Sequence, residues 1–506
     1  MLAAHKNMND KPKSKWLWRL MRWGLIALAV LVTLVAVLVT EENWRGKRAW
    51  ENYKRAAEAR GERFDLASVI PPPVPDEQNF FCAPIVANAL KNPAIFNIYR
   101  GDSENWPTNG GNWQKSKLTD LKQWQDYFRK FSLSPKGRTN GFPIAAQPQT
   151  PAADVLLALS CFDPALEDFR QASLRPHARM PLNYEKGFEE VGAWLPSLAA
   201  EKRWAQFLQL RTLADLQAGQ SQAALEDAKL FLRVTDSLRD QPYLISHLVR
   251  IAMMAIALQP IYEGLAQHSW NDAQLSELET VLEKEDFLAD YKTAMRGERM
   301  CGIDALEKMR LTREEKSSEP ENGGAIVTNS LRLMPSAFFY QNELACAQRM
   351  ELGILPLVDL TNRVVSPSAV DQTEATITNE MKHLSPYKML SLMSLPAVGK
   401  SILRFAMIQT QTDLARVACA LERFRLAHGN YPESLDELAP QFVASVPHDV
   451  IGGKPLHYRR TDDGKFVLYS VGWNEKDDGG TLIANKNGRV LWEQGDCVWQ
   501  YPVKQN

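Results

Sequence analysis

The chain has 506 residues, of which 45% are hydrophobic and 24% are charged. This length predicts two or three folded units, and the composition is that of a globular chain rather than a disordered one. The 59 Lys and Arg nearly balance the 60 Asp and Glu. The chain therefore lacks the basic surplus typical of nucleic-acid-binding proteins, and we expect no nucleic-acid partner.

The cysteines are widely spaced along the chain. They are Cys82, Cys161, Cys301, Cys346, Cys419 and Cys497. No two of them stand in CxxC spacing, which argues against a zinc ribbon or a thioredoxin-type site. The even count permits disulfides in an oxidising compartment, but isolated buried thiols are the simpler expectation.

One stretch predicts a membrane span. Residues 23–40, WGLIALAVLVTLVAVLVT, contain no charged residue, and as a helix they would be about 27 Å long, close to the hydrocarbon thickness of a bilayer. Trp23 and Trp44 match the aromatic belts found at membrane interfaces. The run ends in Thr40-Glu41-Glu42, without the small residues of a cleavage site, so we expect an uncleaved signal anchor.

The orientation of the span follows from its flanks. Lys and Arg lie on both sides, but a short basic tail before the first apolar helix usually stays in the cytoplasm. Residues 1–22 are therefore expected inside. The sequence predicts a single-pass protein of the inner (cytoplasmic) membrane with the lipid bilayer as a partner and its large domain outside.

The next segment, residues 41–76, reads as a juxtamembrane helix followed by a Pro-rich spacer, because Pro71, Pro72, Pro73 and Pro75 exclude a helix. Residues 100–150 are rich in Gly, Pro and Asn. Trp106 and Trp113 in this stretch suggest either carbohydrate contact or, more simply, a loop whose Trp rings pack back onto the protein.

Residues 77–396 predict a helical domain. In 210–234, LRTLADLQAGQSQAALEDAKLFLRV, apolar residues recur at helical spacing and Gly219 marks a break. This segment resembles one tetratricopeptide hairpin, but no second copy follows at the 34-residue period that such repeats show, so we expect irregular helical pairs, weakly tetratricopeptide-like. Ser269 and Asn271 are both candidate N-caps of the helix that follows.

The same domain has further expected features. Leu275, Leu278 and Leu282 form the apolar side of the helix after Asn271, residues 312–324 form a solvated loop, and a helix follows around 330–355. The core candidates in that last helix are Met334, Phe338, Phe339, Leu344 and Leu352.

Catalytic motifs are absent from the sequence. There is no GxSxG, no HExxH, no Gly-rich phosphate loop and no EF-hand. Glu380 and His383 stand in Glu-x-x-His spacing, but a di-iron bundle uses two such motifs, so chance is the simpler explanation. His448, Asp449 and His457 lie close in sequence and are the thin support for an enzyme.

The C-terminal residues predict a helix followed by a small sheet. Residues 401–432 form one long amphipathic helix, with Gly429 as its C-cap and with Glu422 among the residues off the apolar stripe. Ser434 and Glu437 then form a capping box. His457–Arg460 and Lys465–Val471 read as a hairpin that turns at Asp462-Asp463-Gly464, and 484–492 suggests a further short strand.

This order of elements resembles the globular head of the major pseudopilins of type II secretion. The similar stretches are ALERFRLAHGNYPESLDEL, VPHDVIGGKPLHYRR and GKFVLYSVGWNEKDDGG, which together span about 415–480. The whole chain also looks like large bitopic bacterial envelope proteins, a likeness that implies no activity. The resemblance implies a small α+β, pseudopilin-like head over residues 397–506.

The chain departs from that family at its N-terminal span. Pseudopilins carry a Glu at the fifth position of the apolar helix, whereas here Gly24 is followed by Leu-Ile-Ala-Leu-Ala. We therefore do not expect this chain to polymerise as a pilus subunit.

In the family the acidic loop binds calcium, and the matching positions here are Asn474, Asp477 and Asp478. Calcium is a possible cofactor, because carboxylates in a Gly-rich loop suit a hard cation, and a solvated acidic turn is the alternative.

The function predicted from these features is that of a membrane-anchored, non-enzymatic envelope protein. It would be a protein-interaction scaffold for other envelope proteins, possibly in secretion or surface assembly. The alternative is a membrane-anchored enzyme acting on cell-wall polymer or protein. A third hypothesis is a calcium-responsive structural module.

Overall fold

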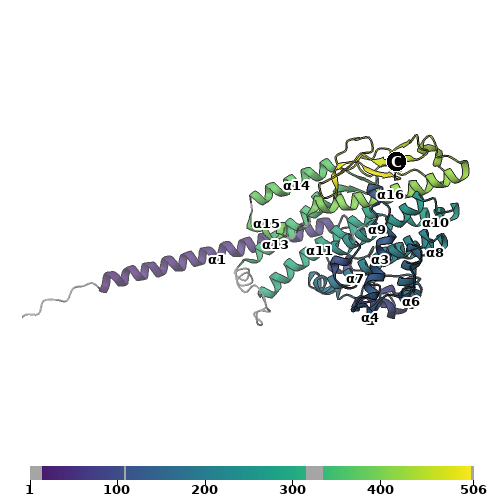
Figure 1. The fold of residues 1–506 in the computed structure, drawn as a ribbon. Coiled ribbons are helices and arrows are strands. Elements are labelled where there is room, and N and C mark those ends of the chain that lie inside the picture. The colour runs from purple at the N-terminus through teal and green to yellow at the C-terminus, as the bar shows by residue number, and fades with distance from the viewer. Residues whose placement is uncertain are drawn as a thin grey trace, which may run out of the picture. The chain divides into compact units, whose positions relative to one another are not determined.

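The computed structural model describes residues 14–107, 110–314, 334–383, 385–393, 395 and 397–502. The protein is mainly helical with small sheets near its C-terminus (Figure 1). It folds as two compact units. Unit 1 comprises residues 1–64, 306–346 and 384–393, and unit 2 comprises residues 65–305, 347–383 and 394–506.

Unit 1 is built on one long helix. Helix α1 runs over Ser14–Glu58 without a break, so it contains the predicted span 23–40 and the charged residues that follow it. Its most apolar 18-residue window has none of its residues buried. Helix α1 is long and apolar enough to span a membrane. A membrane also accounts for its exposed Leu and Val side chains, because these side chains are stable in lipid and costly in water.

Among the residues that the structure describes, two other stretches are also long and apolar enough to span a membrane. They are α9 (Leu244–Ala266) and the stretch Pro386–His428, but 67% and 62% of their most apolar windows are buried inside the protein. Their hydrophobic residues are therefore core residues of the folded chain, and α1 is the helix whose apolar surface has no protein cover.

The rest of unit 1 packs on α1 just beyond the apolar stretch. Helix α13 (Ser336–Arg349) begins beside α1, where the Ala337 N–H donates to Asn43 Oδ1 at 2.7 Å. The Asn342 side chain links α13 to α15 (Pro386–Met393), because it donates to the Pro386 carbonyl at 3.1 Å and accepts from the Ser391 N–H at 3.1 Å.

The core prediction for the 330–355 helix is confirmed in part. Phe338 and Phe339 are buried, whereas Leu352 is 69% exposed, so its assignment to the core was wrong. The helix changes to a π-helical turn at Met350–Ile354, and this wider turn breaks the 3.6-residue period on which the prediction relied. Of the predicted loop 312–324, residues 315–324 lie outside the described residues.

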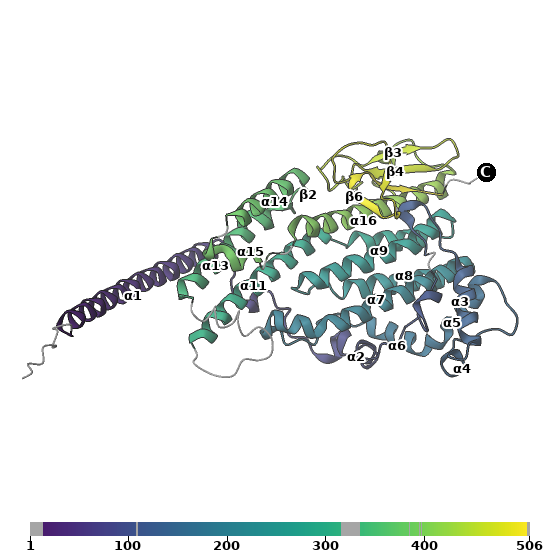
Figure 2. The same cartoon turned by 60° about the vertical axis from the view of Figure 1, so that its left-hand side comes forward.

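Unit 2 is a layered array of helices (Figure 2). In chain order its helices are α2 (Pro84–Lys91), α3 (Leu121–Leu133), α4 (Gly137–Asn140), α5 (Pro151–Leu159), α6 (Asp163–Ser173), α7 (Phe188–Gln217), α8 (Ser221–Asp236), α9, α10 (Asp272–Glu283), α11 (Phe287–Glu314, whose last residues belong to unit 1), α14 (Pro367–Lys382) and α16 (Val398–His428).

Helices α7, α8 and α9 pack on one another, α10 packs on α8 and α16, and α16 also packs on α9. The predicted break between α7 and α8 is confirmed, since Gly219 has φ +74° and no side chain to resist that conformation. Of the two candidate N-caps of α10, the structure uses Asn271 rather than Ser269. Asn271 and Gln274 form a capping box there.

Helix α16 differs from the predicted amphipathic helix. It is buried on nearly all sides, from Val398 to Glu422. Glu422 was predicted to lie away from the core, but it is fully buried, pairs with Arg425 and accepts from the Tyr431 hydroxyl at 2.7 Å. The sheet covers the side that an amphipathic helix would expose, and α16 contacts β4 and β7.

The sheets are small and antiparallel. The strands are β1 (Val358–Asp359), β2 (Val364–Val365), β3 (His457–Arg460), β4 (Phe466–Ser470), β5 (Leu482–Ala484), β6 (Val490–Gly495) and β7 (Cys497–Gln500). The predicted hairpin is confirmed as β3–β4, with Gly464 at φ +76°. The sequence analysis did not predict β7, which pairs with β4 and makes β4 the central strand of the order β3-β4-β7.

The compact units divide the chain differently from the predicted domains. Residues of the predicted helical domain and of the predicted head belong together in unit 2, because α16 packs among α9, α10 and α14. The Pro-rich spacer is partly packed. Pro71 is buried and its carbonyl accepts from Arg179 Nε at 2.9 Å.

Two glycines give a matched test of the packing in unit 2. A Cβ on Gly297 of α11 would lie 1.6 Å from the Pro242 carbonyl oxygen, whereas a Cβ on Gly192 of α7 would meet nothing within 4 Å. We expect Gly297→Ala to lower the melting temperature, at a cost of about 1–3 kcal/mol or more. Gly192→Ala should raise it, by about 1 kcal/mol of stability. Equal effects of the two substitutions would contradict the packing of α11 on Pro242.

A buried acid predicts how stability depends on pH. Glu201 of α7 is fully buried, and neither carboxyl oxygen has a hydrogen-bond partner. Burial raises the pKa of this carboxyl well above its usual range. The folded state therefore holds the proton more tightly than the unfolded chain. The resulting stability is full below the unfolded pKa of about 4.3 and is lost as pH rises towards the folded pKa.

We expect Glu201→Gln to remove this loss. Between about pH 5 and about pH 8, the melting temperature of the variant should fall less than that of the wild type. The exposed Glu104 supplies the control, because Glu104→Gln should leave the pH dependence as it is. An unchanged slope in Glu201→Gln would show that Glu201 does not titrate in this range.

Candidate functional site

The three residues that supported an enzyme each make contacts within the fold. His448 Nε2 lies 3.3 Å from the Arg363 carbonyl oxygen. Asp449 is buried and its carboxylate accepts from the backbone N–H groups of Ile451 and Val471. His457 instead stacks on Tyr469, with ring centroids 4.9 Å apart. The residues serve a turn and a strand pair.

The other isolated motifs also have structural roles. Glu380 pairs with Arg349 at 2.6 Å, and His383 lies just past the end of α14. Trp113 is 3% exposed and lies 5.0 Å from Trp499, measured between ring centroids. Trp106 packs on Tyr99 at 4.9 Å. Both Trp rings therefore pack back onto the protein, as the simpler of the two predictions stated.

The acidic loop brings two of the three predicted calcium ligands together. Asn474 Nδ2 donates to Asp478 Oδ2 at 3.0 Å. Asp477 accepts instead from the Tyr469 hydroxyl at 3.0 Å and from the Gly479 N–H at 2.9 Å, and the latter bond is the main reason that the pKa of Asp477 is lowered. The three side chains therefore do not enclose one position.

The residue that holds this loop was missed in the sequence. Asp496 is buried, and its carboxylate accepts from the backbone N–H groups of Asp478, Gly480 and Thr481. Across the residues that the structure describes, no group of three or more His, Cys, Asp or Glu is placed to hold a metal ion. Calcium binding by Asn474, Asp477 and Asp478 stays a prediction.

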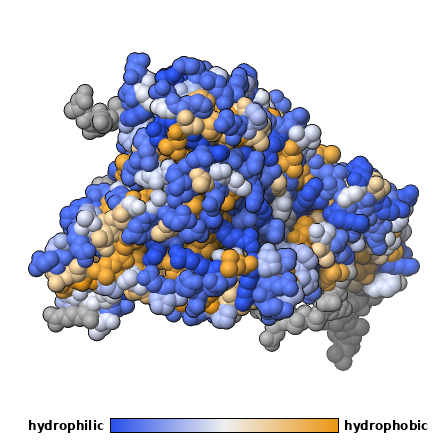
Figure 3. Space-filling model, turned by 90° about the vertical axis from the view of Figure 1, so that its right-hand side faces the viewer, coloured by the Kyte–Doolittle hydropathy of each residue, from blue (hydrophilic) through white to orange (hydrophobic). Residues whose placement is uncertain are grey.

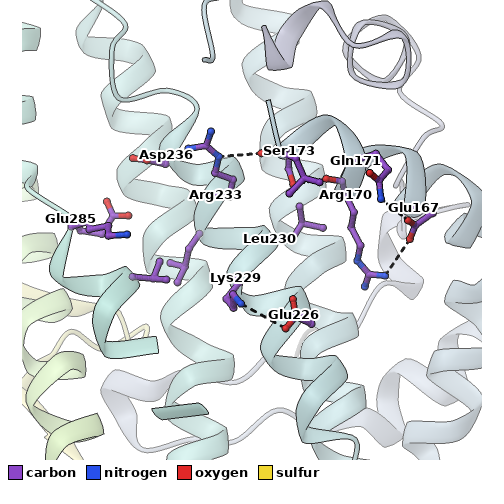
Figure 4. Close-up of a pocket in the computed structure, with 14 residues that line it drawn as sticks. Glu167, Arg170, Gln171, Ser173, Glu226, Lys229, Leu230, Arg233, Asp236 and Glu285 are labelled. Atoms are coloured by element: carbon purple, nitrogen blue, oxygen red, sulfur yellow. Dashed lines mark hydrogen bonds and ion pairs between the residues drawn. The ribbon is translucent and has the colours of Figure 1, made fainter. Parts of the chain in front are cut away.

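The larger feature of unit 2 is a groove between α6, α8 and α10, which we call the α8 groove (Figure 4). Its volume is about 630 Å³. It is lined by Glu167, Arg170, Gln171, Ser173, Leu174, Glu226, Lys229, Leu230, Leu232, Arg233, Asp236, Val281, Lys284 and Glu285. Apolar side chains from α8 and α10 form its floor, and charged side chains form its rim.

Most of the rim charges are already paired. Arg170 pairs with the fully buried Asp227, which also accepts from Arg211 Nε at 2.9 Å. Lys229 lies 2.8 Å from Glu277. Arg233 donates to the carbonyl of Ser173 at the end of α6. These bonds fix the helices that form the groove, so its shape is set before any partner binds.

A buried ion network lies at one end of the α8 groove. Arg250 is fully buried and pairs with Asp290 and Glu285, and it lies 3.1 Å from Asp236. Burial raises the pKa of Asp290 to about 7, and Arg250 opposes that shift. Loss of one member of such a network costs about 3–5 kcal/mol, because the remaining charges stay buried without a partner.

None of the residues that line the α8 groove is His or Cys. Its carboxylates, Glu167, Glu226, Asp236 and Glu285, each take part in an ion pair within the fold. The groove offers apolar contacts from Leu230 and Val281, together with Leu174, which is 75% exposed at its edge. Sequence reasoning missed it because its three walls come from separate helices. The one signal was the pair Lys229 and Arg233, four residues apart on one side of α8.

No family model, curated protein or solved structure matches the chain. The argument for function therefore depends on the sequence and on the geometry described above.

The calcium prediction has a direct test. Because Asp477 is engaged elsewhere and only Asn474 and Asp478 are adjacent, we expect the full-length protein to melt at the same temperature in millimolar calcium and in excess chelator. A ligand that binds only the native state must raise the midpoint. A rise with calcium that Asp478→Ala abolishes would contradict this expectation and establish the site.

Proposed function

We propose that this protein is a single-pass scaffold of the inner membrane that binds other envelope proteins and has no catalytic role. Helix α1 would anchor it, with the N-terminus in the cytoplasm and the larger part of the chain outside. The observation that carries the proposal is the α8 groove, which combines an apolar floor, a charged rim and a shape fixed by buried ion pairs.

The arrangement of helices supports this proposal. Helices α7 and α8 form a tight hairpin at Gly219, as in a tetratricopeptide unit, and proteins built from such pairs use the surfaces between successive helices for binding. The α8 groove lies on the side of the array formed by the alternate helices α6, α8 and α10. Irregular, weakly tetratricopeptide-like pairing is therefore part of the proposal.

The C-terminal region adds a second element. Its long helix, short capped helix at Leu435–Leu438 and antiparallel sheet follow the order expected of a pseudopilin-like head. We propose a role in secretion or surface assembly on this basis. His448, Asp449 and His457, on which the enzyme alternative depended, each have a structural partner within the fold, so the geometry does not favour that alternative.

A photo-crosslinking experiment in cells tests the proposal. A photoreactive amino acid replaces Leu174, at the edge of the α8 groove, or Leu133, a comparably exposed residue that does not line it. We expect discrete adducts with envelope proteins from position 174 and not from position 133. Lys284→Glu, which reverses a rim charge, should weaken the adducts.

Two results would contradict the proposal. One is the same set of adducts from both positions, which would indicate random collision. The other is the absence of adducts at position 174 although the protein is present at its normal level in the membrane.

A further inference from the structure

A second groove lies on a different side of the helical array, between α9, α16 and β6, and we call it the α16 groove. Its volume is about 570 Å³, within the range of ligand pockets. It is lined by Gln114, Leu248, Ile251, Ala252, Ala255, Lys400, Leu403, Arg404, Met407, Ile408, Gln411, Arg489, Val490, Leu491, Trp492 and Glu493. It shares no residue with the α8 groove.

The walls of the α16 groove are mainly apolar. Ile251 of α9 and Leu403, Met407 and Ile408 of α16 are buried where they line it. On the face shown in Figure 3, hydrophobic residues occur in several patches separated by hydrophilic ones rather than in one continuous surface. On that face, the apolar surface is therefore divided among separate patches.

The rim of the α16 groove is cationic. Lys400 and Arg404 are exposed and lie one helical turn apart on α16, and Arg489 is exposed just before β6, on the opposite wall. None of the three side chains forms an ion pair or hydrogen bond with the described residues. Glu493 is the one acidic residue in the lining.

These unpaired cations differ from other arginines of unit 2. Arg250, Arg416 and Arg425 each pair with a carboxylate. The three unpaired cations are exposed beside apolar side chains, so an acidic ligand seated in the groove can form ion pairs with them that it partly shields from water. The excess of positive charge on the rim of the α16 groove therefore favours an acidic ligand.

A buried amide distinguishes between acidic ligands. Gln411 is 3% exposed, lines the groove and has no hydrogen-bond partner among the described residues. An acyl chain would leave this amide unsatisfied, at a free-energy cost, whereas the backbone of a peptide offers both a donor and an acceptor. The groove therefore favours a peptide over a lipid.

The strand that closes the groove has the form of a peptide-binding edge. Val490 pairs with Ala484 and Gly495 pairs with Leu482, so the residues of β6 between them leave the ladder as a bulge. The consecutive residues 489–493 all line the groove. A bulge leaves backbone groups out of the ladder, and a bound chain can pair with them.

We infer that the α16 groove binds an acidic segment of a partner protein in which apolar side chains alternate with carboxylates. The carboxylates would pair with Lys400, Arg404 and Arg489, the apolar side chains would contact Ile251 and Met407, and the peptide backbone would bond to Gln411. This binding site is additional to the α8 groove and does not depend on it.

Peptide selection on the full-length protein in nanodiscs tests the inference. A phage library of random peptides is selected on the wild type, with the double variant Arg404→Glu/Arg489→Glu used to remove peptides that bind elsewhere. We expect enrichment of peptides with Asp or Glu between apolar residues. The dissociation constant of the best peptide, measured by fluorescence anisotropy, should rise roughly tenfold or more in the double variant and rise with salt.

Two further variants complete the design. Gln411→Leu should weaken the peptide, and Lys284→Glu, which alters only the α8 groove, should leave its affinity unchanged. Melting temperatures establish that each variant is folded, which we expect for the double variant because both arginines are exposed and unpaired.

Failure to enrich acidic peptides, or equal affinity of wild type and double variant, would overturn the inference. So would tighter binding of a fluorescent fatty acid by Gln411→Leu with no change for the peptide, since that result indicates a lipid site.

Discussion

The burial of α16 is the constraint on which the architecture of unit 2 depends. This helix contacts α9, α10 and α14 and also the strands β4 and β7, so the helical array and the sheet share one hydrophobic core. Glu422 lies near its C-terminal end. There it joins Arg425, the Tyr431 hydroxyl and the His268 ring, which comes from the turn before α10. A buried ionised carboxylate needs such partners, and here they join α16 to the turn before α10 and to the loop that follows α16.

Buried charges also join neighbouring elements elsewhere in unit 2. Asp227 of α8 joins Arg170 of α6 to Arg211 of α7, and Arg250 of α9 joins carboxylates from α8, α11 and the turn before α11. Hydrophobic contact alone permits helices to slide, whereas an ion pair in a low-dielectric interior holds one register. The α8 groove therefore has a defined shape because of residues that lie beneath its surface.

The sequence predicted the features that arise from local chemistry. The apolar span in α1, the glycine break at Gly219, the capping box at Asn271 and the β3–β4 hairpin each depend on residues within a few positions of one another. The features that were missed depend on distant pairing. Trp113 packs on Trp499, β7 becomes visible only as a partner of β4, and both grooves take their walls from separate helices. The spacing of apolar residues in one helix does not show which other elements cover that helix. The sequence therefore predicted an amphipathic α16, although strands β4 and β7 cover it.

The two grooves differ in how their charges are satisfied, and this difference bears on how a scaffold distinguishes its partners. In the α8 groove most rim charges are paired within the chain, so a partner gains little from them and must be recognised by shape and by contact with Leu174 and Leu230. In the α16 groove the cations are unpaired, so long-range attraction would bring the proposed acidic partner to the site and fix its register. If both grooves are used as we propose, the protein would hold two different chains at once without competition between them, which is the physical requirement for a scaffold.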